Sequence, residues 1–263
     1  MMEWDPGPPP SIRSIFEAAP LVAYQGKPKR FRLEWGPHYY RGRLDGSAKA
    51  LVIGQDPAAD ENVARRILVG DAGQRVQGLL AKLGLTRSYI MVNASLYCIF
   101  GQFDPELQAF MDLPAVTQWR NQLLTALAGP TLQVILAMGQ AAQHVTDTWP
   151  GAASFSSGGR LFKLLHPTAR PEPSVKQNWS GQLNAVAAKL TADADGHRDL
   201  SPYKSGTFTA QDLADIPLRD LGFGAPAWMG TGNMATRVQS GKPLPAMAKK
   251  NPSIIWSALG KQG

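Results

Sequence analysis

Three side chains that can do chemistry, Asp56, Asn93 and His166, each stand directly after an apolar run of the sequence. A carboxylate can position a water molecule or stabilise a neighbouring cation, and an imidazole can hold developing negative charge. An amide carries a donor and an acceptor, so it can read the edge of a nucleobase. If the fold brings them together, these residues place a carboxylate, an amide and an imidazole around one crevice.

Each of these residues also has an ordinary structural interpretation. An Asp-Pro pair after a strand is commonly a turn, an Asn after a strand is commonly a cap, and a His-Pro pair is commonly a loop. Their functional meaning therefore depends on the elements that position them.

Four short apolar runs are predicted to be buried strands, because each is bounded by Gly, Pro or polar residues and is too short for a helix. These runs are residues 48–54, 89–92, 132–137 and 161–165. Stretches with helical spacing of apolar residues lie between them, and one continues from the last strand to about Leu190. The alternation predicts a single α/β domain, with a four-stranded parallel sheet flanked by helices on both faces.

In an open sheet of this kind the ligand crevice lies beyond the carboxyl ends of the strands. The residues at those four positions are all polar or glycine. They are Gln55 and Asp56, Asn93, Gly139 and Gln140, and His166. We expect them to converge on one rim, with Asp56 in a cleft and not in the core.

The chain divides into three parts by composition. Residues 48–190 hold the predicted core, residues 1–47 form a basic and aromatic arm expected to pack on it, and residues 191–263 form a Gly/Pro-rich extension. Within the extension, residues 210–223 are predicted to make one short helix, and residues 252–259 are apolar enough to dock onto the body.

The arm has the composition of a nucleic-acid-binding surface. Its basic and aromatic residues are Lys27, Lys29, Arg30, Arg32, Arg41 and Arg43, with Phe31, Trp35, Tyr39 and Tyr40. The chain has 27 Lys and Arg against 20 Asp and Glu, a net charge of +7 that favours a polyanionic partner. The alternative is a solvated basic edge whose aromatic side chains pack inward, and the composition leaves both open.

Several classes of protein do not fit this sequence. No apolar run approaches the roughly 20 residues of a membrane span, and the amino-terminal residues lack the features of a secretory signal. We therefore expect a cytoplasmic protein, associated with the nucleoid if bacterial. With Cys98 as the single cysteine and four scattered histidines, neither an iron-sulfur cluster nor another metal or cofactor is expected.

Two end motifs in this order resemble the uracil-DNA glycosylase superfamily. The first is GQDPA at residues 54–58, and the last is HPTAR at residues 166–170. Between them, MVNASLY places Asn93 where the family has a uracil-reading Asn. The resemblance covers residues 51–190.

The resemblance implies a role for each matching residue. Asp56 would orient the attacking water, and His166 would donate a hydrogen bond to uracil O2. Asn93 would read the Watson-Crick edge of the uracil, and Gln55 would bind it. The other implied contacts are Leu68 and Ala58 with the uracil, and Gly139, Gln140, Thr168 and Arg170 with the DNA.

The sequence also departs from the family pattern. Ala58 stands where the best-known members have a Tyr that blocks the thymine methyl group, and Leu68 stands where a stacking Phe is usual. Several branches hold an iron-sulfur cluster on four cysteines, which a chain with one cysteine cannot do. Arg170 replaces a Leu wedge of some members, so it would grip a phosphate or fill the vacated stack.

The expected function is excision of uracil from DNA by hydrolysis of the N-glycosidic bond of a flipped nucleotide. The product would be an abasic site in base excision repair, and the enzyme would be a monofunctional, metal-free monomer acting on single- or double-stranded DNA. Two alternatives fit the same residues. One is a non-catalytic protein of this fold that binds uracil or abasic DNA, and the other is an enzyme that acts on free nucleosides or nucleotides.

Overall fold

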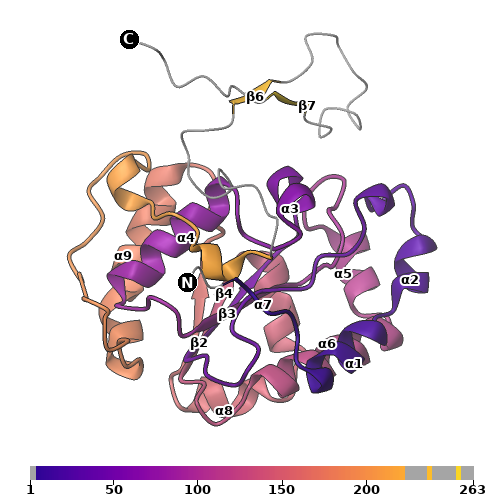
Figure 1. Ribbon diagram of the computed structural model, residues 1–263, viewed down its shortest axis with the longest axis horizontal. Coiled ribbons are helices and arrows are strands. Elements are labelled where there is room, and N and C mark those ends of the chain that lie inside the picture. Colours follow the sequence, from indigo (N-terminus) through magenta and orange to yellow (C-terminus); the bar gives the residue numbers. More distant parts are fainter. Residues whose placement is uncertain (1–3, 223–235, 239–252, 256–263) are drawn as a thin grey trace.

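The computed structural model describes residues 4–222, 236–238 and 253–255. Helices cover both faces of a central sheet in this part of the chain (Figure 1). The predicted α/β class is therefore confirmed. No helix within the described ranges is both long and apolar enough to cross a membrane.

The central sheet has the strand order β1-β3-β2-β4-β5. Its strands are β1 (Arg41–Gly42), β2 (Ala50–Gly54), β3 (Tyr89–Asn93), β4 (Val134–Met138) and β5 (Leu161–Leu164). The four predicted strands are β2 to β5, and they run parallel to one another. The prediction missed β1, which pairs antiparallel with β3, because a two-residue strand that begins with Arg leaves no apolar run.

Nine α-helices and three short 3-10 turns surround this sheet in the described residues. The helices are α1 (Pro10–Glu17), α2 (Leu21–Gln25), α3 (Ala59–Ala64), α4 (Asp71–Lys82), α5 (Pro105–Met111), α6 (Pro114–Leu127), α7 (Gln140–Asp147), α8 (Ala152–Ser157) and α9 (Glu172–Lys189). The 3-10 turns are η1 (Leu33–Trp35), η2 (Ala210–Asp212) and η3 (Leu218–Asp220).

The sheet separates two hydrophobic cores because successive side chains of a strand point to opposite faces. Leu51 and Ile53 of β2 join the core that contains side chains of α1, α5, α6, α7 and α8. Ala50 and Val52 join the core that contains side chains of α4 and α9. All residues of β2 are buried, as expected for a parallel strand covered on both faces.

Much of the amino-terminal arm faces inward. Phe31, Trp35 and Tyr40 are buried, and so are the side chains of Arg32 and Arg41. For these residues the second interpretation holds, in which the aromatic side chains of the arm pack inward. Lys27 and Lys29 remain exposed.

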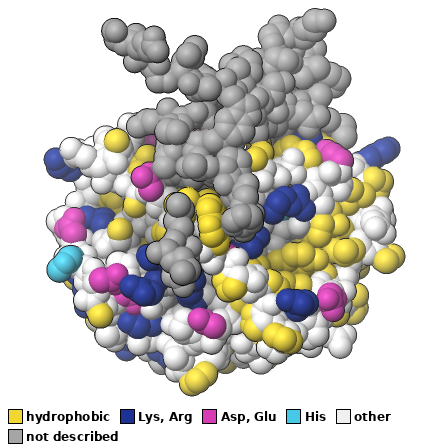
Figure 2. All heavy atoms as spheres, viewed as in Figure 1, with side chains coloured by type: hydrophobic (Ala, Val, Ile, Leu, Met, Phe, Trp, Pro, Cys, Tyr) yellow, Lys and Arg dark blue, Asp and Glu magenta, His cyan; other side chains and the backbone are white. Residues whose placement is uncertain are grey.

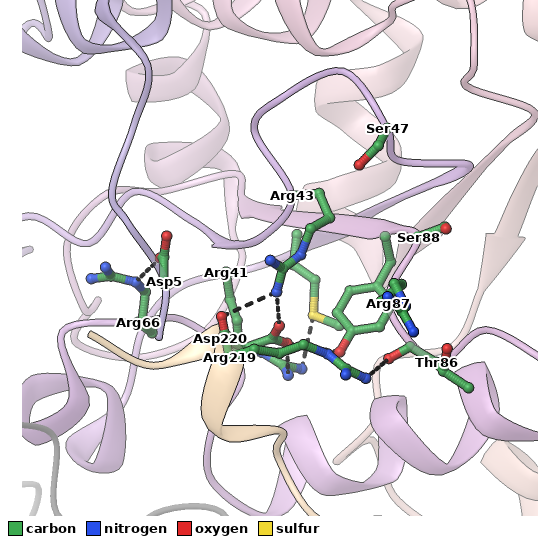
Figure 3. A network of polar contacts seen from close by, with 12 residues as sticks. Asp5, Arg41, Arg43, Ser47, Arg66, Thr86, Arg87, Ser88, Arg219 and Asp220 are labelled. Atoms are coloured by element: carbon green, nitrogen blue, oxygen red, sulfur yellow. Dashed lines mark hydrogen bonds and ion pairs between the residues drawn. The ribbon is translucent and has the colours of Figure 1, made fainter. Parts of the chain in front are cut away.

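The first part of the carboxy-terminal extension packs on the body through a buried ion cluster (Figure 3). The Asp220 carboxylate accepts hydrogen bonds from Arg41 at 3.0 Å, from Arg43 at 2.8 Å and from the Tyr89 hydroxyl at 2.7 Å. Arg41 and Asp220 have no exposed side-chain surface. This cluster ties η3 to β1, so a contact between residues about 180 positions apart stabilises the strand that the sequence did not reveal.

The extension differs from its prediction in one detail. Residues 210–223 were expected to form one helix, but the described part contains two separate 3-10 turns, η2 and η3, because Pro217 removes an N–H and interrupts the helical pattern. The docking expected of residues 252–259 lies outside the described residues. Within this segment the structure describes only the backbone of Ser253–Ile255, which forms β7 and pairs antiparallel with β6 (Thr236–Val238).

Candidate active site

The carboxyl ends of the parallel strands bring the predicted site residues to one edge of the sheet. Gly54 is in register with Asn93, and Met138 is in register with Leu164. Asp56 lies two residues beyond the end of β2, and His166 lies two residues beyond the end of β5. Only β4 lies between these strands, so at a spacing of about 4.8 Å the strand ends are roughly 10 Å apart.

The Asp56 carboxylate is held in place through both of its oxygens. Gln55 Nε2 donates to Oδ1 at 3.1 Å, and the backbone N–H of Ile99 donates to Oδ2 at 2.9 Å. The loop that carries Asp56 is itself anchored, because the Ser95 N–H donates to the Gln55 carbonyl at 2.8 Å. The sequence did not identify Ile99, whose contribution is a backbone group and leaves no signal in residue type.

Asn93 presents an amide with unused hydrogen-bonding capacity. Its Oδ1 and Nδ2 atoms are buried, and neither has a hydrogen-bond partner among the described residues. The side chain lies against Gly54, where a Cβ atom would come within 2.5 Å of Oδ1. Buried polar groups are nearly always paired in folded proteins, so this donor and acceptor are available to pair with a ligand or with water.

Leu68 forms a wall beside this amide. Its Cδ1 lies 3.7 Å from the position that a Cβ of Gly54 would occupy. The side chain is buried, and the backbone is left-handed with a φ of 52°, an uncommon conformation for a residue other than glycine. Ala58 is exposed and precedes α3. The structure therefore groups Leu68 with Asn93 and Gly54.

The His166 imidazole is neutral and has a defined tautomer. Burial lowers its pKa from 6.5 to about 4, because a charged ring would lose hydration. The Thr168 backbone N–H points at Nδ1 from 3.3 Å, and the Thr168 hydroxyl lies 3.1 Å away. A backbone N–H can only donate, so Nδ1 is the acceptor and the ring proton resides on Nε2.

Groups from two helices fix the loop that carries His166. Asn178 Oδ1 of α9 accepts the Leu165 N–H at 2.9 Å, and Trp179 Nε1 donates to the Leu165 carbonyl at 3.0 Å. From α4, Arg75 donates to the Pro167 carbonyl at 2.8 Å. These three side chains were missed by the sequence reasoning, because long-range contacts with backbone groups follow no spacing rule.

The four residues expected to contact DNA occupy different surroundings. Gly139 is buried with a φ of 89°, and a Cβ there would lie 3.0 Å from His166 Cβ, so glycine permits the close approach. Gln140 is exposed at the start of α7. The Arg170 side chain is 75% exposed and pairs with the buried carboxylate of Glu172. Thr168 contacts the His166 ring, as described above.

Charge on the surface does not by itself locate a partner. Figure 2 shows the Lys and Arg side chains of one face in separate groups, with acidic side chains among them. Among the described residues no three His, Cys, Asp or Glu side chains gather as a metal ion would require. A groove of about 510 Å³ lies elsewhere, lined by residues such as Ile15, Asn121 and Trp149, and it contains none of the predicted site residues.

The fold is α/β, and one edge of its sheet combines an oriented carboxylate, an amide without a partner among the described residues, and an imidazole whose pKa is lowered by burial. The family model of the uracil DNA glycosylase superfamily matches residues 42–186, more than half of the chain. The chain belongs to this superfamily, which confirms the resemblance seen in its sequence. Membership indicates DNA-glycosylase-like chemistry on a DNA substrate. A comparison with curated proteins finds no match.

Proposed function

We propose that the protein is a monofunctional uracil-DNA glycosylase, which hydrolyses the N-glycosidic bond of a flipped deoxyuridine and leaves an abasic site. The observation that carries the proposal is the Asn93 amide, unpaired and buried at the sheet edge that also holds Asp56 and His166. Superfamily membership supports the reaction class.

Asp56 would serve the sugar side of the reaction. As the glycosidic bond lengthens, the sugar becomes oxocarbenium-like and needs a negative charge nearby. Both oxygens of Asp56 already accept hydrogen bonds, from Gln55 and Ile99, so the carboxylate would be oriented before the substrate arrives. The carboxylate would accept a hydrogen bond from the attacking water.

His166 would serve the base side. The departing uracil becomes anionic, and a donor aimed at O2 stabilises that charge more in the transition state than in the ground state. With Nδ1 occupied by Thr168, the neutral ring has its N–H on Nε2. Thr168 therefore acts through His166, in addition to the DNA contact expected from the motif.

Asn93 would select uracil over cytosine. Its amide would donate to O4 and accept from N3–H, whereas cytosine presents an amino donor and an unprotonated N3 at those places. Discrimination then arises because the wrong base leaves buried polar groups unpaired. Leu68 and Ala58 would line the same pocket, Leu68 by aliphatic contact.

DNA would cross the edge of the sheet next to the His166 loop. Flipping a nucleotide costs about a few kcal/mol, and contacts from the exposed Gln140 and Arg170 side chains with the DNA would offset part of it. Gly139 would let the backbone come close to the strand. Arg170 would contact a phosphate, because a guanidinium pairs well with two oxygens at once.

An excision assay tests the proposal. The protein is incubated with oligonucleotides that contain one uracil, thymine or hypoxanthine, single-stranded or paired, and alkali then cleaves the strand at abasic sites. We expect scission at uracil. Intact uracil DNA that is nevertheless shifted in a gel would show a non-catalytic binding protein, and activity on free deoxyuridine alone would show a nucleoside enzyme.

A further inference from the structure

Glu61 is a buried carboxylate that joins two separate segments of the candidate site. It lies on α3 and is 5% exposed. Its Oε2 accepts the Ala58 N–H at 2.9 Å, and its Oε1 accepts the N–H groups of Val69 at 2.8 Å and Gly70 at 3.2 Å. One side chain therefore satisfies three backbone donors on two stretches of chain.

Both stretches carry residues of the proposed site. Ala58 follows Asp56 by two positions, and its hydrogen bond with Glu61 closes the turn that begins α3. Val69 directly follows Leu68. Glu61 thus fixes the distance between the loop that holds the carboxylate and the segment that forms the wall of the base pocket.

The Leu68 backbone depends on such support. A leucine whose backbone is left-handed is strained, and this conformation persists only where surrounding contacts hold it in place. On one side the Leu68 carbonyl packs closely on Gly73, where a Cβ atom on residue 73 would lie 1.6 Å from the carbonyl oxygen. On the other side Glu61 holds the next two N–H groups. This conformation places Leu68 against Gly54, beside the Asn93 amide.

We propose that Glu61 is a positioning residue for base release: it holds Leu68 against Gly54, on the side of the base-reading amide, and keeps Asp56 at a set distance from that wall. The inference rests on the proposed function for its kinetic consequence, but the positional part stands on the hydrogen bonds alone. The competing explanation is that Glu61 only caps α3 and stabilises the fold, since a Glu at the third helical position commonly bonds back to the N-cap.

Glu61→Gln is the variant that separates these explanations. It keeps the size of the side chain but replaces one carboxylate oxygen by an amide NH2, which cannot accept an N–H. Either the Ala58 contact or the Val69 and Gly70 contacts are lost, and the bridge between the two segments is broken in both cases.

Asp193→Asn is a matched control. Asp193 is 7% exposed, and its Oδ2 also accepts three backbone N–H groups, from Thr86 at 2.9 Å, Arg87 at 2.9 Å and Ser88 at 3.1 Å. These donors precede β3 at the amino ends of the parallel strands, opposite the candidate site. Asp193→Asn therefore shows how much base release changes when a similar carboxylate is disrupted far from the base pocket.

The experiment measures base release and amide exchange, both well below the melting temperatures of the variants. We expect Glu61→Gln to lower the single-turnover rate constant by at least about tenfold with a smaller change in DNA affinity, and Asp193→Asn to change the rate less than about twofold. Hydrogen exchange should rise in peptides covering residues 58–70 of Glu61→Gln and stay unchanged in β3 and β4. If Glu61→Gln does not fold, Glu61→Asp keeps the charge, loses one methylene of reach, and should show a smaller effect in the same direction.

The outcomes separate the inference from the proposed function. Equal rate losses in Glu61→Gln and Asp193→Asn, or unchanged exchange across residues 58–70, would overturn the positioning role. If the wild-type protein releases no base from any DNA, the proposed function fails, and the exchange comparison alone then decides whether Glu61 holds the two segments.

Discussion

Because the Asn93 amide is unpaired, we expect Asn93→Ala to affect the stability of the protein far less than its activity. A buried amide without partners costs about 1–3 kcal/mol, and Asn93→Ala relieves that cost. The variant also loses the packing of the side chain on Gly54, a loss of about 1–2 kcal/mol. Because these effects oppose each other, the free energy of unfolding should change by less than about 1 kcal/mol.

Base recognition should suffer far more. Each lost hydrogen bond with uracil is worth about 0.5–1.5 kcal/mol, and base groups left unpaired in the pocket add to this. A total of about 2–4 kcal/mol corresponds to a loss of about 30-fold to 1000-fold in kcat/KM for uracil release. The assays are urea unfolding and alkaline scission of uracil DNA.

Gln133→Ala provides the control. The Gln133 side-chain oxygen accepts the Thr191 N–H at the amino end of β4, so this amide is paired and lies away from the site. Its removal should destabilise the protein by about 1 kcal/mol and leave kcat/KM unchanged. If Asn93→Ala instead destabilised the protein by more than about 2 kcal/mol, as the loss of a buried hydrogen bond can do, or retained full activity, the amide would be structural.

Three further predictions follow from particular contacts. First, an NMR titration should give His166 a pKa of about 4. Between pH 6.5 and 4 the unfolded chain binds a proton there that the folded protein resists, so this residue makes the free energy of unfolding decrease as the pH falls. A measured pKa above about 6 would contradict the effect assigned to burial of the ring. Second, Asp220→Ala leaves the buried Arg41 and the partly buried Arg43 without their carboxylate, so it should lower the free energy of unfolding by about 3–5 kcal/mol in a thermal or urea melt. Asp195→Ala should barely shift the melting temperature, because its ion pair is exposed. Third, Ala58→Tyr should decrease the ratio of thymine to uracil excision in competition assays by narrowing the pocket, and an unchanged ratio would place Ala58 away from the base.

The sequence predicted the elements whose signals are local. Strands β2 to β4 are almost entirely apolar and β5 is interrupted only by Lys163, and the parallel arrangement then required Asn93 and His166 to share an edge with Asp56. By contrast, β1 depends on the buried cluster around Asp220, a partner about 180 residues away. No local pattern could reveal that pairing.

The same distinction applies to the candidate site. Residue types pointed to Asp56, Asn93 and His166, whose side chains have chemistry of their own. The groups that orient them act through the backbone, as the Ile99 N–H does for Asp56 and as Glu61 does for Val69. In the amino-terminal arm, residue type was misleading. Arg41 and Tyr40 have the composition of a nucleic-acid-binding surface, but they are buried in the fold.

The central claim is that Asp56 stabilises the sugar as uracil leaves, and single-turnover excision by Asp56→Asn tests it most directly. The substitution keeps the shape of the side chain and an oxygen that can accept the Ile99 N–H, but it removes the charge. We expect uracil DNA to bind about as tightly as to the wild-type protein, while the rate constant falls by at least about 100-fold, or about 2.7 kcal/mol. Asp147→Asn, which removes an exposed carboxylate paired with Lys163, should excise uracil at the wild-type rate. An Asp56→Asn protein that releases uracil as fast as the wild type would contradict the account.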